Sequence, residues 1–72
     1  MNFGEALERL KSYERVTREG WNGKGMWLEL QVPDANSKMN RPYVYMKAAN
    51  DELVPWVCSQ SDMLADDWMV VS

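Results

Sequence analysis

The chain has 72 residues and a formal net charge of −3, from eight basic and eleven acidic side chains, and it contains no histidine. Its single cysteine cannot form an internal disulfide, and one thiol without histidine cannot make a tetrahedral zinc site, so we expect no metal and no resident cofactor. The scattered basic residues lack the net basic face that holds nucleic-acid polymers, so we expect no DNA or RNA partner.

We expect one small domain over residues 1–72. A chain of this length buries only about 60% of the surface that it exposes when unfolded, so its core alone gives limited stability. Four Trp, three Tyr and six Met are many large apolar side chains for so short a chain. Since disulfides and zinc are excluded, association of several copies is the remaining common remedy, and the sequence predicts a homo-oligomer.

The first ten residues, MNFGEALERL, lack the apolar segment of a signal peptide. No apolar run approaches the roughly 20 residues that cross a bilayer. Together with the free thiol, these features predict a cytoplasmic protein with no membrane partner.

An amphipathic helix is predicted over residues 3–13. Its apolar residues recur at helical spacing, at Phe3, Ala6, Leu7 and Leu10. Asn2 is a suitable N-cap, and Glu5 three residues later completes a capping box. We interpret this helix as part of the scaffold.

Five strands are predicted, at residues 14–18, 26–31, 43–49, 53–57 and 68–71. Pro55 cannot donate a ladder hydrogen bond, so its strand is expected at a sheet edge. A short helix is predicted before the last strand, with Ser59 as N-cap and Asp62 three residues later. Short turns between strands favour antiparallel pairing, so the expected class is α+β: an N-terminal helix, a small antiparallel sheet and a short second helix.

The glycine-rich stretch GWNGKGMW, residues 20–27, is not a nucleotide motif. It lacks the spacing of a P-loop, and a dinucleotide fingerprint starting at Gly23 would meet Leu28 at its sixth position. Asn22-Gly23 is instead a strong hairpin-turn dipeptide. Trp21 then either covers the core or contacts a ligand.

Alternation along residues 26–31 places Trp27 on the polar strand face, away from the aliphatic face. A flat aromatic ring there could stack on a base or lie in a subunit interface. Tyr43 and Tyr45 share one face of their strand, with Met46 on the other. Because such a strand has few polar positions on either face, we expect this aromatic face to pack against another subunit.

The start of the second helix is a further candidate site. Ser59, Gln60, Ser61 and Asp62 lie where free backbone N–H groups favour anions. Asp62 would compete with a bound anion, but it could accept hydrogen bonds from ribose hydroxyls. Plain helix capping is the alternative interpretation.

No catalytic set is evident. Without histidine, Ser-His-Asp and Cys-His nucleophiles are excluded in their usual form. Pairs such as Asp66-Asp67 could do acid–base chemistry, but eleven carboxylates always produce pairs. We therefore expect no enzyme and no catalytic residue.

Three stretches resemble a family of small phage and prophage proteins, the second type of Thoeris anti-defence protein. They are NFGEALERLKSYERVTREGWNGKGMWLELQ, PYVYMK and VPWVCSQSDMLADDW, and together they cover nearly the whole chain. The most distinctive element is R-x-G-W-N-G-K-G-M at residues 18–26. The loop at residues 32–42 is short, and loop differences could change ligand choice.

The resemblance implies a protein that binds cyclic ADP-ribose-type signals of bacterial TIR-domain immune proteins without cleaving them, in the cytoplasm of an infected or lysogenic host. Sequestration would keep the downstream effector inactive. Some relatives also hold cyclic dinucleotides. The family assembles as homotetramers with ligand pockets between protomers.

On this resemblance we expect three tryptophans to offer aromatic surfaces to adenine, and polar groups to hold ribose and phosphate. The predicted ligand-binding residues are Trp21, Trp27 and Trp56, the basic Arg18 and Lys24, the turn residues Asn22 and Gly23, and Ser59, Gln60, Ser61, Asp62 and Met63. Tyr43 and Tyr45 are the predicted oligomer interface. Two other classes stay open: a protein-interaction or structural phage module without a nucleotide ligand, and a nucleotide-cleaving enzyme that uses carboxylates.

Overall fold

The computed structural model describes residues 1–21 and 25–71. Within them the chain forms α1 (Phe3–Lys11), β1 (Arg15–Arg18), β2 (Trp27–Gln31), β3 (Tyr43–Lys47), β4 (Leu53–Pro55), α2 (Gln60–Met63) and β5 (Trp68–Val71). The expected α+β class is confirmed, with an N-terminal helix, an antiparallel sheet and a short helix before the last strand. The predicted Asn22-Gly23 turn lies outside the described residues.

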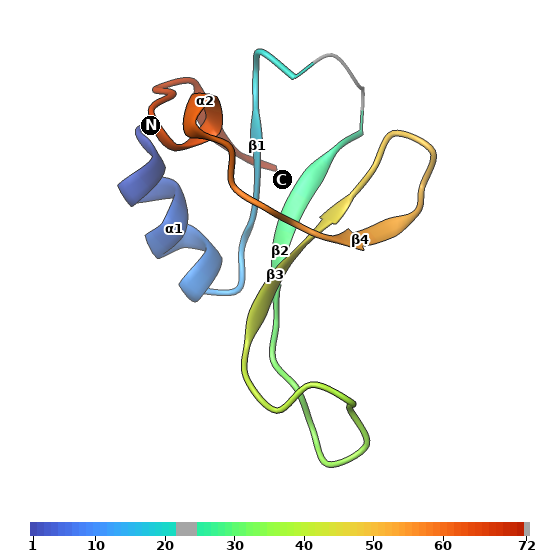
Figure 1. The fold of residues 1–72 in the computed structure, drawn as a ribbon. Coiled ribbons are helices and arrows are strands. Elements are labelled where there is room, and N and C mark those ends of the chain that lie inside the picture. Colours follow the sequence, from blue (N-terminus) through green and yellow to red (C-terminus); the bar gives the residue numbers. More distant parts are fainter. Residues whose placement is uncertain (22–24, 72) are drawn as a thin grey trace.

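The strands form one antiparallel sheet in the order β4-β3-β2-β1-β5 (Figure 1). The last strand pairs with the first, so that Arg18 lies opposite Trp68 across the ladder. The longest ladder joins β2 and β3, and the 32–42 loop beyond it extends away from the sheet. The predicted edge position of Pro55 is confirmed, because β4 is an outer strand.

The sequence explains why α1 begins and ends where it does. The Asn2 side chain accepts the Glu5 backbone N–H at 2.8 Å, and the Glu5 carboxylate accepts the Asn2 N–H at 3.0 Å, so the predicted capping box is confirmed. The chain then reverses at Tyr13, which has a positive φ of 65°. This turn lays α1 across one face of the sheet.

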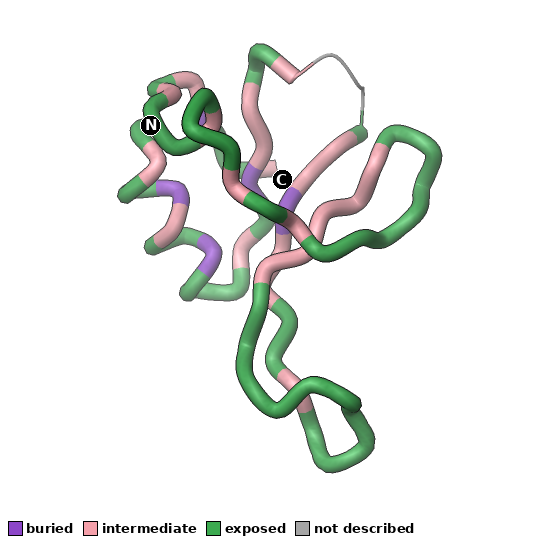
Figure 2. The backbone as a smooth tube through the Cα atoms, in the orientation of Figure 1, coloured by how far each residue is buried: buried purple, intermediate pink, exposed green. Residues whose placement is uncertain are grey.

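The core lies between α1 and the sheet. It is built from five fully buried apolar side chains, Ala6, Leu10, Val16, Leu28 and Trp68 (Figure 2). Burying a side chain such as leucine stabilises the fold by about 1.5–3 kcal/mol. So few buried residues leave many large apolar side chains near the surface.

The opposite face of the sheet carries no helix among the described residues. Alternation along β2 places Leu28 in the core and therefore directs Trp27 to this open face. The predicted orientation of Trp27, away from the aliphatic face, is thereby confirmed. The register places Tyr45 opposite Glu29 and Tyr43 opposite Gln31, so both tyrosines share this face with Trp27.

In the described ranges 1–21 and 25–71, neither helix is long and apolar enough to cross a bilayer.

Candidate functional site

Trp68 is the centre of an aromatic cluster on the α1 side of the sheet. Its ring centroid lies 5.4 Å from that of Trp21, 6.2 Å from that of Trp56 and 5.6 Å from that of Phe3. Both tryptophan pairs are edge-to-face, with interplanar angles of 78° and 85°. Trp68 is 2% exposed, whereas Trp21 and Trp56 are half-buried and reach the surface. Trp68 therefore belongs to the core, and its two neighbouring tryptophans link the core to the surface.

Asp62 connects this cluster to the start of α2. Its Oδ1 atom accepts the Trp21 indole N–H at 3.0 Å, and its carbonyl accepts the Trp68 indole N–H at 3.0 Å. Its backbone N–H donates to the Ser59 hydroxyl at 3.1 Å, which confirms Ser59 as the N-cap. One residue of α2 therefore holds two indole rings.

Arg18 forms ion pairs with two carboxylates. Its Nη1 lies 2.7 Å from Oδ1 of Asp62, and its Nε lies 2.7 Å from Oδ1 of Asp67. The three side chains are only 14–25% exposed. The planar guanidinium can present several N–H groups to two carboxylates at once, which a lysine ammonium cannot match in geometry.

These contacts shift the acidity of the cluster. Hydrogen bonds from Arg18 are the main cause that lowers the pKa of the Asp67 carboxyl. Burial raises the pKa of Asp62, but hydrogen bonds with Trp21, Arg18 and Ser59 outweigh it, so that the net pKa is lowered. The hydrogen bonds to both carboxylates raise the pKa of Arg18. The cluster is therefore ionised at neutral pH.

Asp67 also holds the chain just before Trp21. Its Oδ2 accepts the Gly20 N–H at 2.8 Å, and its carbonyl accepts the Glu19 N–H at 3.2 Å. A Cβ atom on Gly20 would lie 2.9 Å from Oδ2 of Asp67, so glycine permits this close approach. The segment that carries Trp21 is thus fixed to the start of β5.

A second group of polar and aromatic side chains lies on the open sheet face. The Arg15 guanidinium lies 4.3 Å from the centroid of Trp27, and its Nε is 3.3 Å from Oε1 of Glu29. Tyr45 donates a hydrogen bond to the same carboxylate, and its ring packs edge-to-face with Trp27. Burial first, and then the bond to Glu29, raise the pKa of Tyr45 to about 12.

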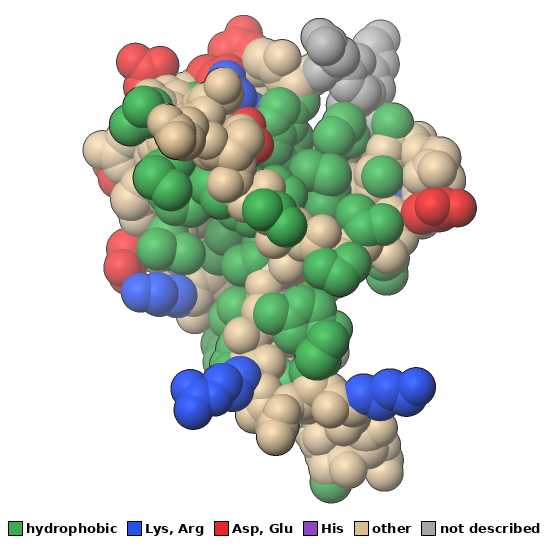
Figure 3. All heavy atoms as spheres, viewed as in Figure 1, with side chains coloured by type: hydrophobic (Ala, Val, Ile, Leu, Met, Phe, Trp, Pro, Cys, Tyr) green, Lys and Arg blue, Asp and Glu red, His purple; other side chains and the backbone are tan. Residues whose placement is uncertain are grey.

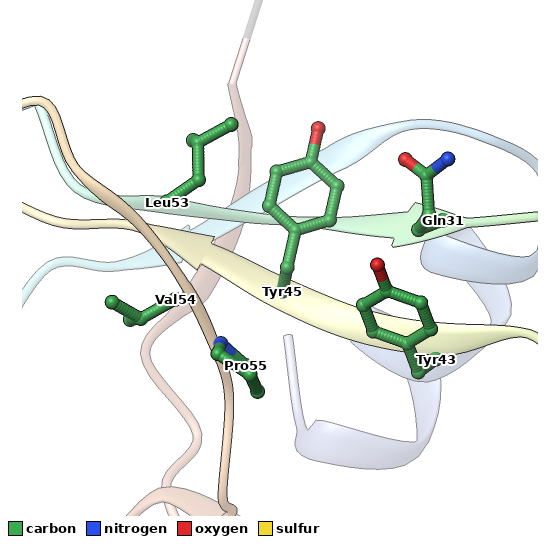
Figure 4. Close-up of a pocket in the computed structure, with 6 residues that line it drawn as sticks. All are labelled: Gln31, Tyr43, Tyr45, Leu53, Val54 and Pro55. Atoms are coloured by element: carbon green, nitrogen blue, oxygen red, sulfur yellow. The ribbon is translucent and has the colours of Figure 1, made fainter. Parts of the chain in front are cut away.

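The open face contains a groove of about 180 Å³ at the edge formed by β3 and β4. Figure 4 shows the Tyr43 and Tyr45 rings rising on the same side of β3, with Leu53 and Gln31 beside them. A second groove, of about 380 Å³, includes Trp27 and Met69. Both grooves are open to solvent, and apolar atoms make up most of their lining.

Charge does not single out an anion site. Figure 3 shows hydrophobic side chains in a band across the middle of the molecule, with acidic side chains above and beside it and two basic side chains near the 32–42 loop. α2 has only four residues, and Ser59 already uses one of its first N–H groups.

Across residues 1–21 and 25–71, no group of three or more carboxylates and thiols could hold a metal ion.

The structure brings together some of the predicted ligand-binding residues. Arg18, Trp21, Ser59 and Asp62 form one connected group, and Trp56 contacts the same aromatic cluster through Trp68. The remaining α2 residues are exposed beside them; they are Gln60, Ser61 and Met63.

Other predicted residues are not part of that group. Trp27 lies on the opposite face of the sheet from Trp21, so one protomer does not bring the two rings to one ligand. Asn22, Gly23 and Lys24 lie outside the described residues. Their assignment to the ligand site stays a prediction, as does the interface role of Tyr43 and Tyr45.

Sequence reasoning missed Asp67. It lies in the Asp66-Asp67 pair, and among eleven carboxylates such a pair carries little information by itself. Its partner Arg18 is 49 positions away, and only the pairing of β1 with β5 brings the two together. Sequence reasoning also missed Glu29, because only the pairing of β2 with β1 and β3 brings it to Arg15 and Tyr45.

Comparison with known proteins relates the chain to one family. A family model described as the Thoeris anti-defense 2-like domain matches residues 1–71. A protein of Bacillus phage SP01 named Thoeris anti-defense 2 is 42% identical over 85 residues, which covers 100% of this chain and 96% of the relative. Because the aligned region is longer than the 72 residues of this chain, the relative contains residues without a counterpart here.

Proposed function

The chain belongs to the Thoeris anti-defense 2-like family, and from this premise we propose that it counters bacterial Thoeris immunity by sequestering a cyclic ADP-ribose-type nucleotide without cleaving it. The family supports the anti-defence role of a phage-type protein. Our proposal adds three points to that role: that the protein acts by sequestration, that its ligand is this nucleotide, and that it acts in the host cytoplasm. Sequestration requires tight contact with the signal, not chemistry on it.

The arrangement around Trp21 carries this proposal. The half-buried indole lies at the surface, and its N–H donates to Asp62 at the start of α2. Ser59, Gln60 and Ser61 are exposed beside it and offer hydroxyl and amide groups. An aromatic ring next to polar groups is the combination that a nucleoside requires, since the base stacks and the ribose and phosphate form hydrogen bonds.

The affinity that sequestration requires supports a binding site shared between protomers. A protein that traps a scarce signal needs nanomolar binding, about −12 kcal/mol. A base stacked on an aromatic ring contributes only about 1–3 kcal/mol, so one exposed ring is insufficient. Trp21 and Trp27 lie on opposite faces of one protomer, and a pocket that used both would combine two chains.

We propose that the protein assembles as a homotetramer and that the open sheet face is one of its interfaces. On this face Met69 is 47% exposed, Leu53 is 63% exposed and Tyr43 is 37% exposed. Several large apolar side chains exposed on one sheet face of so small a domain are typical of an interface. The Arg15, Glu29 and Tyr45 contacts give the face polar groups that could set the register of a second copy.

A release experiment tests sequestration. The protein is incubated with glycocyclic ADP-ribose, separated from free ligand and then heat-denatured, and the released nucleotide is analysed by mass spectrometry. We expect intact ligand. A cleaved product would contradict sequestration and would support the carboxylate-using enzyme instead. Cyclic dinucleotides are tested in the same way.

Two variants make the experiment specific. Trp21→Ala is expected to lower nucleotide capture, because it removes the aromatic surface beside α2. Tyr13→Asn is the matched control, since it removes an aromatic ring that is 69% exposed and asparagine tolerates the positive φ at this position. Circular dichroism checks that both variants remain folded.

The apolar open face also favours a second candidate, a protein-interaction or structural phage module without a nucleotide ligand. In that case the face would dock a host or virion protein. Calorimetry with a panel of cyclic nucleotides separates the two candidates. Heat of binding that Trp21→Ala abolishes supports the nucleotide proposal, whereas no heat with any nucleotide supports the module.

A further inference from the structure

Arg18 is one of the two basic residues predicted to bind the ligand, but it is poorly placed to neutralise a ligand phosphate. All three of its guanidinium nitrogens face carboxylate oxygens: Nε and Nη2 lie 2.7 and 3.4 Å from the two oxygens of Asp67, and Nη1 lies 2.7 Å from Asp62. One cation and two carboxylates leave the cluster with a net negative charge. An incoming phosphate would therefore be repelled by the cluster as a whole.

The same contacts fix the chain that leads to Trp21. Asp67 accepts N–H groups from Glu19 at 3.2 Å and from Gly20 at 2.8 Å, and it pairs with the Arg18 side chain. Asp67 thus holds three consecutive residues. The backbone N–H of Trp21 then donates to the Arg18 carbonyl at 3.3 Å, which closes a turn.

The Trp21 ring is also held from the side of α2. Its N–H donates to the Asp62 oxygen that pairs with Arg18, and the ring packs edge-to-face with Trp68. The orientation of the indole therefore depends on Arg18 at two points: through the turn that Asp67 holds, and through the shared Asp62 oxygen.

We propose that Arg18 and Asp67 are positioning residues, which shape the ligand site by fixing the orientation of the Trp21 indole and do not contact the ligand. The ligand part of this inference rests on the proposed function. A ring that is already oriented loses less conformational freedom when a base stacks on it, so removing the contacts lowers affinity without removing any ligand contact.

The first measurement needs no ligand. The four tryptophans give four indole N–H signals in a ¹⁵N–¹H correlation spectrum, and Trp21→Phe assigns the Trp21 signal. We expect Arg18→Lys and Asp67→Ala each to shift or broaden this signal. Arg18→Lys keeps the charge but cannot bridge both carboxylates, so it is the milder variant if Asp67→Ala loses its fold.

Arg15→Lys is the matched control. Arg15 pairs with Glu29 on the opposite sheet face, and its side chain is 51% exposed. We expect this variant to leave the Trp21 signal in place. A Trp21 signal that is unchanged in folded Arg18→Lys and Asp67→Ala, or equally changed in Arg15→Lys, overturns the proposal.

The second measurement uses glycocyclic ADP-ribose and a double-mutant cycle. We expect Asp67→Ala to weaken binding by about tenfold in the natural sequence but by much less in a Trp21→Phe background. A merely structural role would lower affinity equally in both backgrounds and would overturn the proposal. A natural protein that binds no nucleotide would contradict the proposed function alone, because the indole signals still decide whether Arg18 and Asp67 position Trp21.

Discussion

Nη1 of Arg18 lies 2.7 Å from Oδ1 of Asp62, although the two residues are 44 positions apart in the chain. The contact joins the end of β1 to the start of α2. A second ion pair, from Arg18 to Asp67, joins the same strand end to the start of β5. These contacts place a cation and two carboxylates beside Trp21, so the acidity of the site and its geometry depend on the same side chains.

Acid is expected to destabilise the protein through this cluster. The pKa values of Asp62 and Asp67 are lower in the folded chain than in the unfolded chain, where a carboxyl of this type has a pKa of about 3.9. The stability that they contribute is therefore fully present above that value and is lost as the pH falls through the lowered folded pKa values. Thermal unfolding between neutral pH and strong acid measures the loss.

Asp67→Asn is the comparison for the acid experiment. It cannot ionise, so we expect its unfolding temperature to be lower at neutral pH and to fall less steeply in acid. Asp34 and Asp51 also have lowered pKa values, but they titrate in the natural protein and in the variant alike. The difference between the two unfolding curves therefore reports on Asp67. Parallel curves would contradict the prediction.

Tyr45 is expected to titrate apart from an ordinary tyrosine. Burial and its hydrogen bond to Glu29 raise the pKa of Tyr45 to about 12. Because the folded pKa is raised, the stabilisation is fully present below the unfolded value of about 10 and is lost as the pH rises through about 12. Ultraviolet absorbance of the phenolate should show a late step. Tyr45→Phe should remove this step, and Tyr43→Phe should retain it.

The core prediction compares two leucines. Leu28 of β2 is 0% exposed on the sheet face that α1 covers, whereas Leu64 is 81% exposed at the end of α2. Leu28→Ala is expected to lower the free energy of unfolding by about 2–5 kcal/mol, because it leaves a cavity. Leu64→Ala should change it by less than about 0.5 kcal/mol. Urea denaturation at one protein concentration measures both, and equal losses would contradict the assigned core.

Local patterns in the sequence predicted much of the fold. The Asn2 and Glu5 capping box, the alternation that separates Leu28 from Trp27, and the Ser59 N-cap each depend on residues within a few positions of one another. Hydrogen bonds within one helical turn determine the two caps, and the pleat of the strand determines the alternation, so all three features are local, and all are confirmed. The edge position of β4 followed from the missing N–H of Pro55 in the same way.

The site was harder to predict because its contacts are distant in sequence. The resemblance predicts Arg18 as a basic ligand-binding residue, but the ladder between β1 and β5 brings it to Asp67. No local pattern indicates that ladder. Trp21 and Trp27 lie only six positions apart and were assigned to one ligand site, yet they lie on opposite faces of the sheet. The topology, not the spacing of residues, separates them.

The open sheet face is expected to hold protomers together, and Leu53→Glu tests it. Leu53 lines the groove beside Tyr45 and is 63% exposed in one protomer (Figure 4). Light scattering should give the natural protein a mass well above the 8.4 kDa of one chain. A carboxylate at position 53 would lose its hydration inside the interface, so the variant should shift toward the monomer. Leu64→Glu makes the same chemical change at the end of α2 and should keep the natural mass. A natural protein that is monomeric, or a mass that Leu64→Glu lowers as much as Leu53→Glu does, would show that this face is not the interface.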